Sequence, residues 1–107
     1  MPWTVVVLSP TVEAELEAFP ADIRARLSRF VALIESQGIE KLHEPHVKHL
    51  EDRLWELRLI GRDGIARAIY VTASGMRVVV VRAFVKKTQR TPHRELELAR
   101  QRAREVR

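Results

Sequence analysis

The sequence predicts an α+β fold with a β-α-α-β-β-β-α order and a mainly antiparallel four-stranded sheet. Three observations lead to this fold: an apolar strand pattern near the N-terminus, two successive helical patterns, and three apolar runs separated by short turns. Short links join antiparallel neighbours, because a parallel pair needs a crossover of a dozen or more residues. We expect one domain over residues 1–107, with a helical hairpin on one face of the sheet and a C-terminal helix.

The first half of the chain supplies one strand and two helices. Residues 3–8 are rich in β-branched and aromatic side chains, which are typical of a strand. Ser9-Pro10 then offers an N-cap and a proline at the first helical position. Apolar residues recur at helical spacing over residues 23–34, and Gly38 supplies a stop for this second helix. Paired as a hairpin, the two helices would cover one face of a sheet.

Residues 39–53 are polar and contain Pro45, so this stretch predicts a connecting loop. Three histidines in it are spaced three apart: His43, His46 and His49. Zinc needs three or four convergent ligands, and a proline between them disfavours one continuous helix that would align the rings. A solvated connection is therefore favoured over a metal site, and no cofactor is expected. Lys48, close to the next strand, is the better candidate for contact with a phosphate.

The second half predicts three strands and a helix. The strands are expected at residues 54–60, 65–72 and 76–85, joined by glycine-containing turns. The four valines of residues 78–81 indicate that the third strand is buried on both faces. Thr91-Pro92 repeats the pattern of Ser9-Pro10 and opens the last helix, whose thin apolar stripe predicts light docking: Leu96, Ala99, Ala103 and Val106.

The charge distribution points to a polyanionic partner. The net charge is +5, and residues 82–107 alone hold nine Lys/Arg against three Asp/Glu. Such a localised excess fits nucleic acid, while the alternative is a solvated basic helix. The absence of cysteine excludes disulfides, thiolate metal sites and a thiol nucleophile. We find no apolar run of membrane-spanning length and no export pattern, so a cytoplasmic protein is expected.

Charged residues inside the expected strands suggest a site. Period-two geometry puts Glu56 and Arg58 on one face of their strand, and Arg67 lies among apolar neighbours in the next. Such charges raise the free energy of folding unless they are paired or face solvent. One interpretation is an Arg–Glu pair that joins neighbouring strands, or an exposed sheet face. The other is a shallow basic cleft, left uncovered by helices, on which these arginines and Lys86-Lys87 converge.

A basic cleft of this kind suits metal-free cleavage of RNA. A ribose 2′-hydroxyl attacks the neighbouring phosphate, fixed cations stabilise the transition state, and a base removes the hydroxyl proton. Aromatic surface for stacking an unpaired base would come from Phe84 or Tyr70, although both types more often pack in a core. The expected catalytic residues are Arg58, Arg67, Lys86 and Glu56. The expected RNA-binding residues are Lys48, Phe84, Lys87, Thr88 and Arg90.

Four segments carry a family resemblance: Lys48-x-Leu50, Leu54-Trp55-Glu56-Leu57-Arg58, Ala66-Arg67-Ala68-Ile69-Tyr70 and Phe84-x-Lys86-Lys87-Thr88-Gln89-x-Thr91-Pro92. Together with Glu95 and Ala99, they make the chain resemble the HigB-like, phage-derived branch of the RelE/ParE toxin superfamily. The likeness covers nearly the whole chain, and its specific part is the Phe-x-Lys-Lys-Thr-Gln-x-Thr-Pro segment. A RelE-like fold is therefore expected.

The resemblance implies the toxin of a type II toxin–antitoxin pair. Such a toxin enters the ribosomal A site, cleaves mRNA and inhibits translation. It is neutralised by a cognate helix-turn-helix antitoxin, and it meets operator DNA only through that complex; no membrane partner is implied. Matched by position, Arg58, Arg67 and Lys86 correspond to functional basic residues, with Phe84, Lys87 and Glu56 as further members.

Two questions stay open on the sequence alone. The general base is unassigned: Glu56 acts as the base or only orients Arg58, and His93 is a further candidate. The target is also open, because a ParE-like inhibitor of DNA gyrase without nuclease activity is the alternative function. A nucleic-acid-binding module without activity is a third. Catalysis requires the cations to gather around one phosphate, whereas gyrase binding does not.

Overall fold

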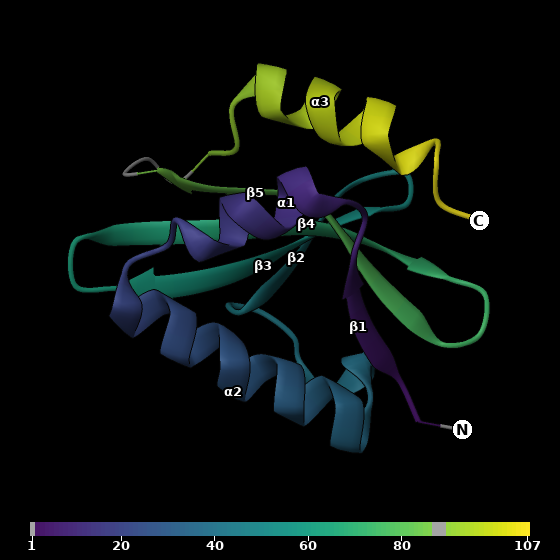
Figure 1. Cartoon of the computed structure of the whole chain (residues 1–107), viewed down its shortest axis with the longest axis horizontal. Helices are drawn as coiled ribbons and strands as arrows, with labels where there is room; N and C mark the ends of the chain where they lie inside the picture. The colour runs from purple at the N-terminus through teal and green to yellow at the C-terminus, as the bar shows by residue number, and fades with distance from the viewer. Residues whose placement is uncertain (1, 87–89) are drawn as a thin grey trace.

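The computed structural model describes residues 2–86 and 90–107. Its elements follow in the order β1 (Thr4–Val7), α1 (Pro10–Glu17), α2 (Ala21–Gln37), a short 3-10 helix η1 (Ile39–Lys41), β2 (Val47–Glu51), β3 (Leu54–Gly61), β4 (Gly64–Ala73), β5 (Arg77–Lys86) and α3 (His93–Ala103). Five strands form one sheet in the order β1-β5-β4-β3-β2. The sheet lies between α2 on one side and α3 on the other (Figure 1).

The α+β class and the helical elements are confirmed, but the sheet has five strands rather than the predicted four. The extra strand, β2, lies within residues 39–53, which were expected to form a loop. It pairs only with β3 and forms an edge of the sheet. An edge strand buries little surface, and the alternation from buried Val47 to exposed Lys48 and His49 leaves too weak an apolar signal to predict it. The sheet is also mixed, because β1 runs parallel to β5.

Two apolar clusters pack on the two faces of the sheet. The first joins the sheet to α1 and α2 and includes Val12, Phe19, Ile23, Ile34, Leu57, Leu59, Tyr70, Val78 and Val80. The second lies under α3 and includes Leu54, Ile69, Val71, Val79, Val81, Phe84, Ala99, Ala103 and Val106. Alternate valines of β5 therefore enter opposite clusters, which confirms that this strand is buried on both faces.

The helix ends follow the predicted caps in part. Ser9 caps α1, since its hydroxyl accepts a hydrogen bond from the Val12 backbone N–H at 3.4 Å. Gly38 ends α2 with φ of 95°, a value that favours glycine. The predicted cap at Thr91 is wrong, because α3 begins at His93 and has no side-chain cap. The Thr91 hydroxyl is instead hydrogen-bonded within the site described below.

Small apolar residues and ion pairs hold α3 on the sheet. The described residues include three ion pairs from this helix to other elements: Arg82 Nε–Glu95 at 2.7 Å, Arg102 Nη1–Glu15 at 3.0 Å and Arg100 Nε–Glu51 at 2.7 Å. The hydrogen bond to Glu95 raises the pKa of the Arg82 guanidinium. Ala99 and Ala103 are buried against the sheet, as expected for close docking, and the ion pairs attach the helix more firmly than its thin apolar stripe predicted.

Candidate nucleic-acid interface

A pocket of about 370 Å³ opens where β2 and β3 meet the start of α3. Its lining, called the β2–α3 pocket from here on, comprises Lys48, His49, Leu50, Arg58, Arg90, Thr91 and Leu96. Three of these residues are cations, and all three were expected to bind or cleave RNA: Lys48, Arg58 and Arg90. They come from β2, from β3 and from the segment before α3. The structure thus brings together cations that lie far apart in the sequence.

Strand register explains how the sheet positions this site. Lys48 lies opposite Glu56, Arg58 lies opposite Arg67, and Arg67 lies opposite Phe84. Residues that face each other across antiparallel strands project from the same side of the sheet. These side chains therefore share the α3 side, as period-two geometry predicted for Glu56 and Arg58.

Glu56 is the buried centre of a charged network. Its side chain has no exposed surface, and its Oε2 accepts a hydrogen bond from Arg58 Nε at 2.8 Å. Its Oε1 accepts from the Thr91 hydroxyl and from Arg67 Nη1, the latter at 3.4 Å. Both carboxylate oxygens are thus engaged, which favours orientation of Arg58 over proton abstraction. The Arg–Glu pair that joins neighbouring strands, one of the two interpretations left open, is present as Glu56–Arg67.

The expectation that Arg67 is an exposed cation is wrong. Its side chain is fully buried, and its Nη1 donates to the Thr91 hydroxyl at 3.0 Å. Thr91, which precedes α3, and Glu56 on β3 both contact this arginine from other parts of the chain. A bare sheet face is likewise wrong in part, because α3 packs on the part of this face that carries Leu54 and Val71. Arg67 does not line the pocket, but it contacts Glu56, which holds Arg58, and Thr91.

The aromatic residues proposed for base stacking are buried as well. Phe84 is 9% exposed and Tyr70 is 2% exposed, and each belongs to one of the two apolar clusters. The Arg82 guanidinium lies 5.6 Å from the centroid of the Phe84 ring. Both rings therefore act as packing residues, the alternative considered from the sequence.

Two further residues considered from the sequence, Lys86 and His93, lie outside the pocket lining. Lys86 is half-buried on the α3 side, opposite Ile65 and therefore one row beyond Arg67 and Phe84. Lys87 and Thr88 fall outside the described residues. The candidate base His93 is exposed on α3, and its Nε2 lies 3.6 Å from Glu97.

Among the described residues, no group of three His, Cys, Asp or Glu is placed to hold a metal ion. Two of the three regularly spaced histidines, His46 and His49, contact different aromatic residues. The ring of His46 meets Phe30 edge-on at 5.3 Å between centroids, and that of His49 lies against Trp55 at 4.7 Å. In the same described part of the chain, no helix combines the length and the apolar character needed to cross a membrane.

Thr91 is the site residue whose role sequence reasoning missed. The Thr-Pro pair was attributed to a helix cap, but the hydroxyl bridges Glu56 and Arg67 instead. The sequence did contain a signal for this role. Glu56 is a single acid near two strand arginines, and a buried carboxylate needs further hydrogen-bond donors, which a hydroxyl such as that of Thr91 can provide.

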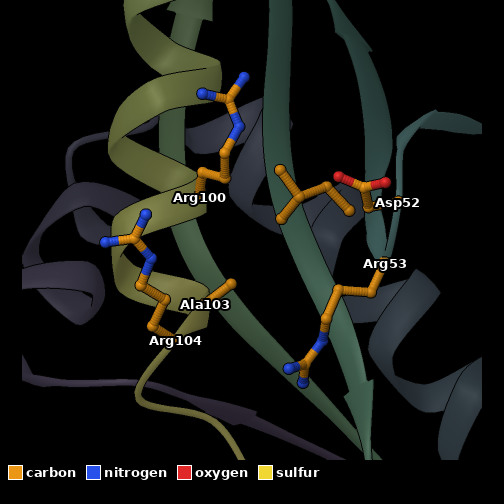
Figure 2. A pocket seen from close by; sticks show the side chains of 6 residues that line it. Asp52, Arg53, Arg100, Ala103 and Arg104 are labelled. Carbon is orange, nitrogen blue, oxygen red and sulfur yellow. The ribbon is translucent and has the colours of Figure 1, made fainter.

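A smaller pocket of about 190 Å³ lies at the other end of α3. Figure 2 shows Arg53, Arg100 and Arg104 around it, with their guanidinium groups pointing in different directions. The hydrogen bond from Arg100 lowers the pKa of Glu51 and raises the pKa of Arg100 itself. Three diverging guanidinium groups do not converge on one phosphate, so the β2–α3 pocket is the stronger candidate site.

Comparisons with known proteins agree with this architecture. The model of the family described as "Phage derived protein Gp49-like (DUF891)" matches residues 14–104 of the chain. A solved structure of a mutant of the E. coli toxin RelE in the free state is similar in fold, with a TM-score of 0.66 at 14% sequence identity. The similarity covers 95% of this chain and 98% of the RelE chain. A comparison with curated protein sequences finds no match.

At that identity, the likeness to RelE shows the fold alone, and the family match rests on the sequence. The two findings agree with the resemblance carried by the strand and lysine motifs, so assignment to the RelE/ParE toxin superfamily is confirmed. The chain belongs to the phage-derived Gp49-like family, a family of RelE/HigB-type toxins.

Proposed function

We propose that this protein is the toxin of a type II toxin–antitoxin pair and a metal-independent endoribonuclease that cleaves mRNA on the ribosome. The observation that carries the proposal is the gathering of Lys48, Arg58 and Arg90 around one pocket. A buried carboxylate fixes one of them, since Glu56 holds Arg58 through Nε. Cations held in place before the reaction stabilise developing negative charge without reorganisation.

In the proposed reaction, the 2′-hydroxyl loses its proton to water as its oxygen forms a bond to the adjacent phosphorus, and the bond from phosphorus to the 5′-oxygen breaks as that oxygen takes up a proton from water. The products are a 2′,3′-cyclic phosphate and a 5′-hydroxyl end. Arg58 contacts the scissile phosphate, and Lys48 and Arg90 hold the phosphates on either side. A fixed donor of this type contributes about 3–4 kcal/mol to transition-state stabilisation. Several such cations would supply much of the rate acceleration.

The other members of the network have supporting roles in this proposal. Arg67, with Thr91, fixes the carboxylate that orients Arg58. Lys86 lies on the same face of the sheet, where it would bind the RNA strand beyond the pocket, and Lys87 and Thr88 follow it in the sequence. Glu56 serves as an orienting group, because both of its oxygens already accept hydrogen bonds.

The proposal extends to partners. The substrate is mRNA engaged by the ribosome in the cytoplasm, and a cognate helix-turn-helix antitoxin neutralises the toxin. Operator DNA is bound only through the toxin–antitoxin complex. Membership in a toxin family of the RelE type supports these partners.

The decisive experiment is induced expression in bacterial cells, followed by mapping of mRNA 5′ ends. Wild-type protein should produce new 5′-hydroxyl ends within translated messages and arrest growth. Arg58→Ala should remove both effects. Arg104→Ala is the matched control, because it removes an equal charge from an exposed position outside the β2–α3 pocket, and it should retain both effects.

One result would overturn the proposed nuclease activity. Growth arrest with intact messages and blocked DNA replication would identify the gyrase-inhibitor alternative instead. Equal cleavage by wild type and Arg58→Ala would show that the pocket is not the reaction site.

A further inference from the structure

A second pocket, of about 480 Å³, meets the β2–α3 pocket at the edge of the sheet. The two pockets share Lys48 and His49 as lining residues. Trp55, Val47 and Leu42 give the second pocket a largely apolar wall, and it is called the Trp55 pocket below. The shared residues belong to the edge strand β2, so a ligand chain that leaves one pocket around this edge enters the other.

The Trp55 pocket presents a fixed aromatic surface. Trp55 is 38% exposed, although its neighbours on β3, Leu54 and Glu56, are buried. Its ring lies 4.7 Å from that of His49, the residue opposite it on β2, with 55° between the planes. The His49 Nε2 lies 2.7 Å from the Asp52 carbonyl oxygen, which fixes the imidazole in turn. A large aromatic side chain left partly exposed beside a polar site is typical of a binding surface.

The register of β2 places charge and aromatic surface on opposite sides of the same edge. Lys48 lies opposite Glu56 and projects to the α3 side, whereas the next residue, His49, projects with Trp55 to the other side. Successive side chains of a strand alternate in this way. Because Lys48 and His49 are neighbours on the edge strand and line both pockets, a phosphodiester chain held at Lys48 can continue around this edge to the aromatic pair.

We propose that the Trp55 pocket binds an unpaired base of single-stranded RNA, next to the phosphate held in the β2–α3 pocket. The base stacks on the Trp55 ring, and Lys48 holds the phosphate that links the two pockets. This inference rests on the proposed function for the position of the cleaved bond. Stacking on an aromatic residue contributes about 5- to 150-fold to affinity for each base.

Intrinsic fluorescence gives a direct test, because the chain has only two tryptophans. The variant Trp3→Phe leaves Trp55 as the sole emitter. We would titrate it with a five-nucleotide single-stranded RNA that carries 2′-O-methyl groups, which prevent cleavage. The matched probe has the same phosphates but lacks its central base. The complete RNA should quench Trp55 and bind about 5- to 150-fold more tightly than the abasic probe. Equal affinities, or binding without quenching, would overturn the proposal, as would the absence of RNA binding.

Two substitutions of Trp55 separate stacking from folding. Trp55→Leu should lose the preference for the complete RNA, and Trp55→Phe should keep most of it, with the thermal unfolding of both measured alongside. Mapping of mRNA 5′ ends in cells then tests whether the Trp55 pocket binds a base next to the cleaved bond. Trp55→Leu should alter the base frequencies beside the cleaved bond, and unchanged frequencies would overturn the placement. If wild-type protein cleaves no mRNA, the proposed function fails, while the oligonucleotide titration still decides whether the pocket binds a base.

Discussion

Replacing Thr91 with valine tests whether the buried network holds the site together. Valine has nearly the shape of threonine, but it removes the hydroxyl that donates to Glu56 Oε1 and accepts from Arg67 Nη1. A hydrogen bond to a charged group contributes about 1.5–3 kcal/mol, and the two bonds share one hydroxyl. Because the 3.4 Å contact between Arg67 and Glu56 remains, we expect unfolding to become easier by about 2–3 kcal/mol.

That loss is large relative to the stability of about 5–15 kcal/mol that is typical of such domains. It corresponds to a fall in Tm of roughly 10–20 °C for a domain of about this size. Urea denaturation followed by circular dichroism measures the change directly. Thr91→Ser keeps the hydroxyl and loses one methyl group, so it should cost only about 1 kcal/mol.

Thr72→Val is the matched control, since Thr72 is exposed on β4. Its effect should stay within about 0.5 kcal/mol of zero. The reasoning fails if Thr91→Val and Thr72→Val are equally stable. It also fails if Thr91→Ser is as damaging as Thr91→Val, because the hydroxyl would then not be the important group.

Three further predictions concern charge and pH. Glu56→Gln leaves Arg67 buried without its counter-charge and should destabilise the fold by about 3–5 kcal/mol in urea denaturation; a loss under 1 kcal/mol would contradict the network. Burial raises the pKa of Tyr70, so its phenol stays protonated in the folded state above pH 10 while the unfolded chain ionises. Stability should therefore fall by about 1.4 kcal/mol per pH unit there. Tyr70→Phe should lack this slope, and absorbance of the single tyrosinate at alkaline pH should appear only on unfolding. The hydrogen bond from Arg100 holds the pKa of Glu51 below its ordinary value of 4.5, so this pair stabilises the fold above that pH and the contribution is lost on acidification through the lowered pKa. Arg100→Gln should reduce the pH dependence of the urea midpoint between pH 7 and 3, and an unchanged dependence would refute the assignment.

The elements with strong apolar periodicity were predictable from the sequence. The run Val78–Val81 indicated a strand buried on both faces, and alternate valines do enter opposite clusters. Ser9-Pro10 correctly marked the start of α1. These features depend on local sequence, because periodicity and capping involve residues close together in the chain.

The features that the sequence did not predict depend on contacts between residues far apart in the chain. β2 is polar because it lies at the edge of the sheet, so no apolar pattern revealed it. Arg67 was expected at the surface, because nothing near it in the sequence shows that Thr91, in the segment before α3, contacts it. The same segment explains Thr91, whose helix-start motif is used for a contact with Glu56, 35 residues away. Lys48, Arg58 and Arg90 were predictable as cations, whereas their common pocket required the tertiary fold.

Mutations can abolish the proposed toxicity in two ways, because Glu56 and Arg67 are buried whereas other site residues line the pocket. A change at Glu56 or Arg67 removes a buried ion pair, so the protein should be destabilised and lose its toxicity for that reason. A change at Lys48, which is exposed on the pocket wall, should leave a well-folded, harmless protein. Mutants recovered from cells that survive expression should therefore form two groups, one degraded or aggregated and one abundant. Only the second group would still be able to compete for an antitoxin.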